Sequence, residues 1–266
     1  MPDHLYQIYY SEPTRQAGDP GFLPLDNLDN PRPDWREYWP IRQFLMNSTL
    51  DERARYGFFS PKFQAKTGLD ATAAHAFLAA SDAEVVLFSP FFDQSALFLN
   101  VYRQAEAHHP GIAAICDSVF RAHDPAFDTR NEITHSTNTV FCNFFAASPR
   151  FWRAWLAVSE SIFAQAEDPD APLAAALNGG VPHDRNIAPC KVFVIERVAS
   201  FLLSRQSWRV AMDARAAMPD GPRPALQRLD ALKIAYARER QPAVLANYRR
   251  LRSEWLAARQ IARGAG

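Results

Sequence analysis

Residues that follow two aromatic, strand-like segments are placed to do chemistry. Ser60-Pro61-Lys62 ends the segment RYGFF, and Asp93 comes shortly after the apolar run VVLF. Open α/β sheets form ligand crevices at the carboxyl ends of their strands. There a lysine can supply positive charge to phosphate oxygens, and a carboxylate can act as a general base. Two ordinary interpretations stay open, with Lys62 as a solvated turn residue and Asp93 as a helix cap.

Other polar residues could bind hydroxyl groups. Asp26 and Asn27 lie in a long segment, Pro13 to Pro40, that holds six prolines and two glycines. They could hydrogen-bond sugar or ribose hydroxyls, although such residues also form ordinary turns. His135 is in the polar string HSTNT, which could hydrogen-bond a carbohydrate and is equally well explained as a solvated loop.

A charged pair, Glu196-Arg197, interrupts the apolar segment KVFVIERVASFLLSR. At least one of the two side chains should be buried and paired, because an isolated charge is costly to bury. A structural ion pair is the simpler interpretation. A position in a ligand crevice would instead favour a catalytic role.

Composition limits the classes of protein to consider. The chain has 266 residues, a formal net charge of zero and 48% hydrophobic residues, enough for one large domain or a domain with an appendage. Balanced charge argues against nucleic acid as a partner. The three cysteines form no CxxC pair, and no segment has the pattern of a signal peptide or a membrane span. We therefore expect a cytoplasmic protein with reduced thiols and no zinc site.

Apolar patterning predicts alternating strands and helices, with an irregular segment from Pro13 to Pro40. The strands expected at 55–59 and 85–88 both run into Phe-Ser-Pro, which is consistent with neighbouring strands that end at one edge of the sheet. Together they indicate an α/β domain at 1–210 and a helical extension at 211–266. Strands are expected at 5–10, 55–59, 85–88 and 138–148, and helices at 40–50, 71–80, 95–107, 111–123, 148–167, 224–240 and 242–262.

Short motifs spread over roughly residues 4 to 208 carry a family resemblance. YGFFSPKF aligns Gly57 and Lys62 with a Gly-x-x-His-Tyr-Arg-Arg-Tyr-Phe motif, without its histidine. NFFAASPRFW, starting at Asn143, is similar to Asn-Tyr-x-x-x-x-Pro-x-Phe-Trp, and Glu196-Arg197 matches a Glu-Arg pair in a late apolar helix. In these motifs the chain resembles bacterial glycosyltransferase-like proteins of capsule and lipopolysaccharide gene clusters.

The resemblance implies a GT-A-like, Rossmann-like mixed sheet flanked by helices, and transfer of a sugar from a nucleotide-sugar donor to a cell-surface polysaccharide or lipid-linked glycan. Such a reaction needs charge stabilisation of the departing diphosphate and, when inverting, a base for the acceptor hydroxyl. The residues implied are Asp93 and Glu196 for catalysis, Tyr9, Ser60, Lys62 and Arg197 for the donor, and Asp26, Asn27, His135 and Asn143 for the acceptor or sugar.

Many GT-A enzymes stabilise the diphosphate with a divalent Mn or Mg ion held by an Asp-x-Asp at a strand end. Here Ser60-Pro61-Lys62 occupies that place, and Asp168-Pro169-Asp170 lies in a hydrophilic break where a turn is expected. The sequence therefore implies no metal ligands and assigns part of the metal's role to Lys62.

Two other functions stay open. A non-catalytic carbohydrate-binding or assembly protein could keep the same shell. The stretch from Lys233 to Arg263 carries eight basic and two acidic residues, so the chain could also be an adaptor on the anionic inner membrane surface.

Overall fold

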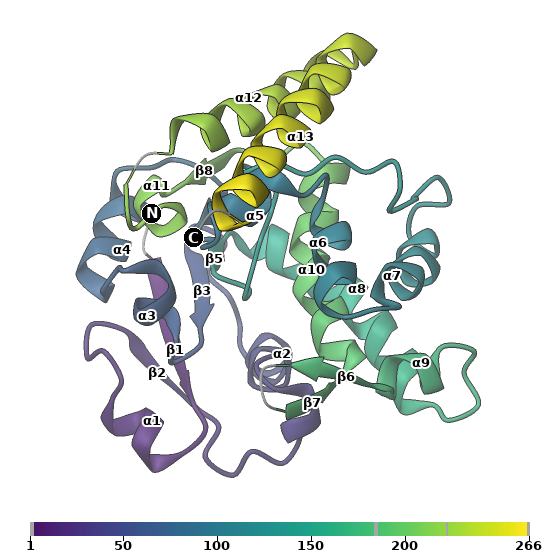
Figure 1. Ribbon diagram of the computed structural model, residues 1–266. Helices are drawn as coiled ribbons and strands as arrows, with labels where there is room; N and C mark the ends of the chain where they lie inside the picture. The colour runs from purple at the N-terminus through teal and green to yellow at the C-terminus, as the bar shows by residue number, and fades with distance from the viewer. Residues whose placement is uncertain (1–2, 184–185, 222, 265–266) are drawn as a thin grey trace.

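The computed structural model describes residues 3–183, 186–221 and 223–264 and is centred on a six-stranded mixed sheet (Figure 1). β5 is antiparallel to both of its neighbours, β3 and β4, and every other neighbouring pair is parallel. The carboxyl ends of β1, β3 and β4 therefore share one sheet edge. In spatial order the strands are β2 (Leu23–Asp26), β1 (Asp3–Tyr9), β3 (Arg55–Phe59), β5 (Phe145–Ala147), β4 (Val85–Leu87) and β8 (Val210–Met212).

Helices cover both faces of this sheet, because alternate strand residues point into two different cores. Phe58 belongs to the larger core and Phe59 to the smaller one. The larger core includes residues of α2 (Tyr38–Asn47), α6 (Val101–His108), α7 (Ile112–Arg121), α8 (Pro149–Glu167), α9 (Ala174–Asn178) and α10 (Cys190–Arg205). The smaller core includes residues of α3 (Phe63–Thr67), α4 (Ala71–Ala79) and α11 (Ala214–Ala217). The predicted α/β class, with helices flanking a mixed sheet, is confirmed.

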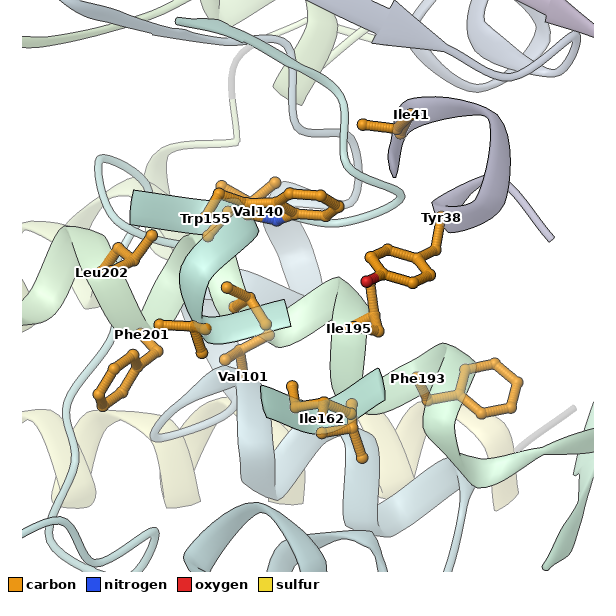
Figure 2. Packing of buried hydrophobic residues seen from close by; sticks show 14 of the residues in the cluster. Tyr38, Ile41, Val101, Val140, Trp155, Ile162, Phe193, Ile195, Phe201 and Leu202 are labelled. Carbon is orange, nitrogen blue, oxygen red and sulfur yellow. The ribbon is translucent and has the colours of Figure 1, made fainter. Parts of the chain in front are cut away.

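Aromatic side chains hold the larger core together. Trp152 Nε1 donates a hydrogen bond of 2.8 Å to the Tyr56 carbonyl, which ties α8 to β3. Figure 2 shows Tyr38 of α2 beside Ile195 of α10, and the Tyr38 and Trp155 ring centroids are 5.8 Å apart. These contacts fix α2 and α10 relative to the end of the sheet that carries the candidate site.

Tight strand packing explains Gly57, the first residue of the resemblance motif. A Cβ at this position would lie 2.8 Å from Leu5 Cδ2 and 3.2 Å from Ala146 Cβ. Leu5 would have to move and the contact with Ala146 would be tighter than most, so close packing favours glycine here independently of any ligand.

The expectation of an irregular segment from Pro13 to Pro40 is wrong. This part of the chain forms α1 (Glu12–Gln16), β2 and the 3₁₀ turn η1 (Pro33–Trp35) before α2 begins. Pro13 fits in the first turn of α1, where its missing N–H costs nothing, and Ser11 caps that helix. Pro24 is tolerated because β2 is an edge strand.

Other boundaries also differ from the sequence prediction. The strand expected at 138–148 is reduced to β5, because Cys142 and Asn143 adopt left-handed φ angles of 60° and 54°. β3 and β4 end at the same edge, but they are not neighbours, since β5 lies between them. The helix expected at 95–107 is divided into α5 (Phe92–Leu97) and α6, whose N-cap Asn100 accepts a bond of 2.7 Å from Arg103 N. The hairpin of β6 (Gly180–His183) and β7 (Asn186–Pro189) was not predicted.

The carboxyl-terminal helices α12 (Pro224–Glu239) and α13 (Pro242–Gly264) agree with the prediction and form a hairpin beside α5 (Figure 1). Lys233 Nζ donates to the carbonyls of Ser95 and, at 2.7 Å, Phe98, and the Tyr248 hydroxyl donates to the Leu97 carbonyl at 2.9 Å. Hydrogen-bond donors from the hairpin therefore cap the end of α5. β8 pairs with β4, so the central sheet includes a strand that crosses the expected boundary between the domain at 1–210 and the extension at 211–266.

Candidate functional site

A cavity of about 360 Å³ opens at the carboxyl ends of β1 and β3. β2 lies on one side of β1 and β3 on the other, so the strand order reverses at β1. In open α/β sheets such a reversal is where ligands bind, because the connecting loops separate there. Ile8 of β1, Tyr10 just after β1 and Ser60 after β3 line this cavity, which has the volume of a small-molecule site.

Charged groups of both signs line the cavity. Arg36, Lys62 and Lys66 contribute positive charge, whereas Glu37 and Glu196 contribute carboxylates. They come from three separate parts of the chain: the segment before α2, the start and body of α3, and α10. Four amides complete the polar lining, from Asn27, Asn30, Asn143 and Asn186.

Burial and the charges of neighbouring groups shift pKa values in this cluster. Burial raises the pKa of Glu37, and the nearby negative charge of Glu196 raises it further. Burial lowers the pKa of Lys66, but Cys142, Glu196 and Glu37 beside it together raise the pKa above its ordinary value. Lys66 is therefore a permanent cation at neutral pH, while Glu37 binds a proton more readily than an ordinary glutamate.

Cys142 lies against this cluster. Lys66 Nζ is 3.0 Å from Cys142 Sγ, and burial raises the pKa of the thiol to about 11. The thiol is therefore neutral at physiological pH and is a poor nucleophile. Its role in the cavity wall is as a weak hydrogen-bond partner for Lys66.

Asn143 combines backbone strain with an unsatisfied polar atom. Its side chain is 5% exposed, and Oδ1 is buried with no hydrogen-bond partner in the described part of the chain. Its φ of 54°, next to Cys142 at 60°, is unfavourable for residues with a Cβ. Strain and an unpaired buried amide persist where the surrounding structure enforces them, and they concentrate at binding sites.

A charged network holds the segment that carries Arg36 and Glu37. Lys191 Nζ, which is nearly buried, bonds to Asp34 at 2.6 Å, and Arg32 bonds to Asp34 at 3.0 Å and to Glu167 at 2.6 Å. The network joins this segment to α8 and α10. Arg36, which follows η1 and lines the cavity, has a positive φ of 46°.

Half of the residues singled out from the sequence line the cavity. They are Ser60, Lys62, Asn27, Asn143 and Glu196. Lys62 is exposed at the N-cap of α3, and its backbone N–H donates to Ser60 Oγ at 3.3 Å. Lys62 is thus a turn residue that also lines the cavity. Glu196 pairs with Arg197 at 2.8 Å while it lines the cavity, which is the crevice position that favours function.

The other half lie outside the cavity lining. Tyr9 lies between the lining residues Ile8 and Tyr10 and points to the other face, where Asp26 of β2 is its cross-strand neighbour. Arg197 is turned into the core, donating to the carbonyl of Phe193 at 3.0 Å.

Asp93 and His135 are also distant from the cavity lining. Asp93 lies in the first turn of α5, whose N-cap is Phe91, and two strand spacings of about 4.8 Å separate β4 from β3. His135 packs near Asp230 and Lys233 of α12, where burial lowers its pKa to about 4.

Sequence reasoning missed Glu37, Lys66, Cys142 and Arg36. Lys66 had a usable signal, because it follows Lys62 by four residues and would share its face on any helix starting there. Glu37 and Arg36 carried no such signal, since only the folded path of the segment before α2 brings them to the strand ends.

A metal site is not evident in the described residues, where no group of three or more His, Cys, Asp and Glu side chains could hold one ion. Asp168-Pro169-Asp170 forms a turn, with Asp170 N donating to Asp168 Oδ1 at 3.0 Å. The cavity cluster is instead suited to an anion at its lysines and to proton transfer at its carboxylates.

Comparisons with protein-family models, with curated proteins and with solved structures gave no match to this chain. Over residues 3–183, 186–221 and 223–264, no helix is both long and apolar enough to cross a membrane.

Proposed function

We propose that the protein is a GT-A-like glycosyltransferase that moves a sugar from a nucleoside-diphosphate donor to a glycan hydroxyl. The observation that carries the proposal is the cavity at the strand-order reversal, which joins lysines to a pair of carboxylates. A departing diphosphate needs cations, and an attacking hydroxyl needs a base, so one small cavity supplies both. The resemblance at Lys62, Asn143 and Glu196 supports the same function, because all three residues line this cavity.

The proposed roles follow from the chemistry of each group. Lys62 and Lys66 stabilise negative charge on the diphosphate. Glu37 takes the proton of the acceptor hydroxyl, whose oxygen attacks the anomeric carbon as its bond to the diphosphate oxygen breaks. The nucleoside diphosphate leaves with that electron pair. Glu37 replaces Asp93 as the candidate base, because it lines the cavity and burial raises its pKa, which makes it a stronger base than an ordinary glutamate.

Thermal unfolding in the presence of nucleoside diphosphates tests this proposal. At a ligand concentration about one hundred times Kd, one bound nucleotide should raise Tm by roughly 5–10 °C. Lys62→Ala should weaken the response to UDP, GDP or ADP, whichever is bound. Arg153→Ala, which removes an exposed ion pair on α8, serves as the control. If UDP, GDP, ADP and CMP all fail to give a saturable rise in Tm, the proposed function is wrong.

A further inference from the structure

A second hollow, of about 530 Å³, lies beside the cavity, between the segment after β2 and helix α2. We call it the α2 groove. Asn27 lines both hollows, so the groove and the cavity share a wall. The groove is lined by Leu25, Asp26, Asn27, Leu28, Asp29, Pro31, Trp39, Pro40, Gln43 and Phe44.

Charge distinguishes the α2 groove from the cavity. Among the described residues that line the groove, Asp26 and Asp29 are the charged ones, and none is a lysine or arginine. Asp26 Oδ1 accepts a bond of 2.9 Å from Leu28 N, and the Asp29 carboxylate has no partner in the described part of the chain. The groove lining contributes carboxylates, whereas lysines line the cavity, so the anionic part of a ligand is better placed in the cavity and a neutral part in the groove.

Aromatic and polar groups face the same space in the groove. Trp39 is packed against Phe163, with ring centroids 6.4 Å apart, and the Arg42 guanidinium lies 5.6 Å from its ring centre. A held indole presents apolar surface at little conformational cost. Beside it, Asp29 and the Gln43 amide offer hydrogen-bond acceptors. A sugar ring has both an apolar C–H face and hydroxyl donors, and it matches this combination.

We infer that the α2 groove binds a neutral saccharide unit of the glycan that accepts the sugar. The acceptor's reacting hydroxyl enters the cavity past Asn27, while the unit behind it rests against Trp39 and donates to Asp29. This inference rests on the proposed function, since the groove acquires its meaning from the transfer in the adjoining cavity. It adds that the acceptor is uncharged next to its reacting end.

Calorimetric titration with three neutral trisaccharides, maltotriose, cellotriose and triacetylchitotriose, tests the inference. The full chain should bind at least one of them with millimolar affinity. Asp29→Asn and Trp39→Ala should each weaken it at least about tenfold, because each removes one of the two kinds of contact. Trp39→Phe keeps an aromatic surface and should retain much of the affinity. Trp208→Phe, at an indole that packs on Phe151, is the matched control.

The outcomes separate this inference from the proposed function. If a nucleoside diphosphate raises Tm but no trisaccharide binds, the inference about the α2 groove is wrong and the transferase proposal stands. Trisaccharide binding that Asp29→Asn and Trp39→Ala leave unchanged would overturn the groove as well. Binding that depends on Asp29 and Trp39, in a protein that binds no nucleotide, would keep the groove as a saccharide site and overturn the transferase.

Discussion

Lys62 and Lys66 are four residues apart at the start of a short helix, and both line one cavity. Lys66 is held by Cys142 and by neighbouring carboxylates, whereas Lys62 is exposed at the cavity rim. Two ammonium groups that line one cavity at the end of a strand can offset negative charge on a diphosphate without a metal ion. The more exposed lysine is the one that a substitution can remove with least damage to the fold.

We expect Lys62→Ala to lower turnover with a confirmed donor far more than it lowers the free energy of unfolding, because an exposed turn residue contributes little to the core. Lys62→Arg should retain partial activity, since the charge remains but the broader guanidinium is displaced. Wild-type turnover should survive EDTA. Activity that disappears on chelation and returns with manganese, beside an unaffected Lys62→Ala, would leave Lys62 as a turn residue only.

Glu37 gives a second expectation at the residue scale. Glu37→Gln should reduce turnover by about 10²–10⁴-fold, the usual contribution of a general base, while the nucleotide still raises Tm. Glu52→Gln, at an exposed carboxylate, is the control. The same turnover assay should include Asp93→Asn, since Asp93 is the base that the sequence predicted. A greater loss of turnover in Asp93→Asn than in Glu37→Gln would return the role of base to Asp93.

The site could be predicted in part because strand ends are readable. A proline and a lysine after an aromatic strand located Ser60 and Lys62 at the sheet edge, where they line the cavity. Tyr9 was assigned one position away from Tyr10, which does line it, and in a strand that single step reverses the face. Glu37 reaches the cavity through ion pairs between distant parts of the chain, the charged network around Lys191. No local pattern in the sequence predicts such pairs.

At the scale of elements, the segment before α2 has only the short 3₁₀ turn η1 as regular structure, and the charged network ties it to the rest of the molecule. Lys191 is 2% exposed and contacts Asp34 at 2.6 Å and Asn178 Oδ1 at 2.8 Å. A buried cation with two partners is difficult to replace, because its removal leaves both partners unpaired.

We therefore expect Lys191→Met to lower the free energy of unfolding by about 2–4 kcal/mol in urea titrations. Arg153→Ala, which breaks a 2.6 Å pair with Glu52 at the surface, should cost under about 1 kcal/mol. Equal losses in the two variants would mean that the network around Lys191 does not stabilise the segment. Lys191→Met should also weaken nucleotide binding, since the segment carries Arg36 and Glu37.

Elements with strong local signals were predicted well. Asp70 caps α4 through a 2.7 Å bond to Ala73 N, as its position before the helix indicated, and β3 matches its predicted range. β2 and β8 were missed because they are short strands at the two sheet edges and carry little apolar periodicity. β5 was overextended, since an aromatic run does not reveal left-handed backbone at Cys142 and Asn143.

At the scale of the whole molecule, the carboxyl-terminal hairpin is fastened to the body by a buried cation. Burial lowers the pKa of Lys233 to about 7, against an ordinary value of 10.5. Between these values the unfolded chain holds a proton that the folded chain has released, so the free energy of unfolding rises with pH. Below about pH 7 both states are protonated and this contribution is flat.

Urea titrations from pH 6 to pH 10 should therefore show wild type gaining stability with pH relative to Lys233→Met. The variant should also be less stable throughout, because the carbonyls of Ser95 and Phe98 lose their donor. A constant difference between the two proteins over this range would contradict the shifted titration of Lys233.

The hairpin also carries exposed positive charge, although not all of its arginines are free. Arg252 donates to the Leu97 carbonyl and Arg250 pairs with Glu254 at 2.6 Å, whereas Arg249 is exposed. We expect weak sedimentation with vesicles containing phosphatidylserine at low salt, reduced by Arg249→Glu and lost at about 0.5 M salt. Equal sedimentation with neutral phosphatidylcholine vesicles would remove the electrostatic basis of this expectation.

The cavity takes its walls from stretches as far apart along the chain as Ile8 and Glu196. A ribosome delivers a chain amino end first at about 5–20 residues per second, so these walls are made roughly 10–40 s apart. During that interval β4 also lacks β8, and its open edge is of the kind that pairs with foreign strands. A ligand therefore cannot guide the nascent chain. It can only select polypeptides already made past Glu196, which makes occupancy of the cavity a mark that α10 has been synthesised.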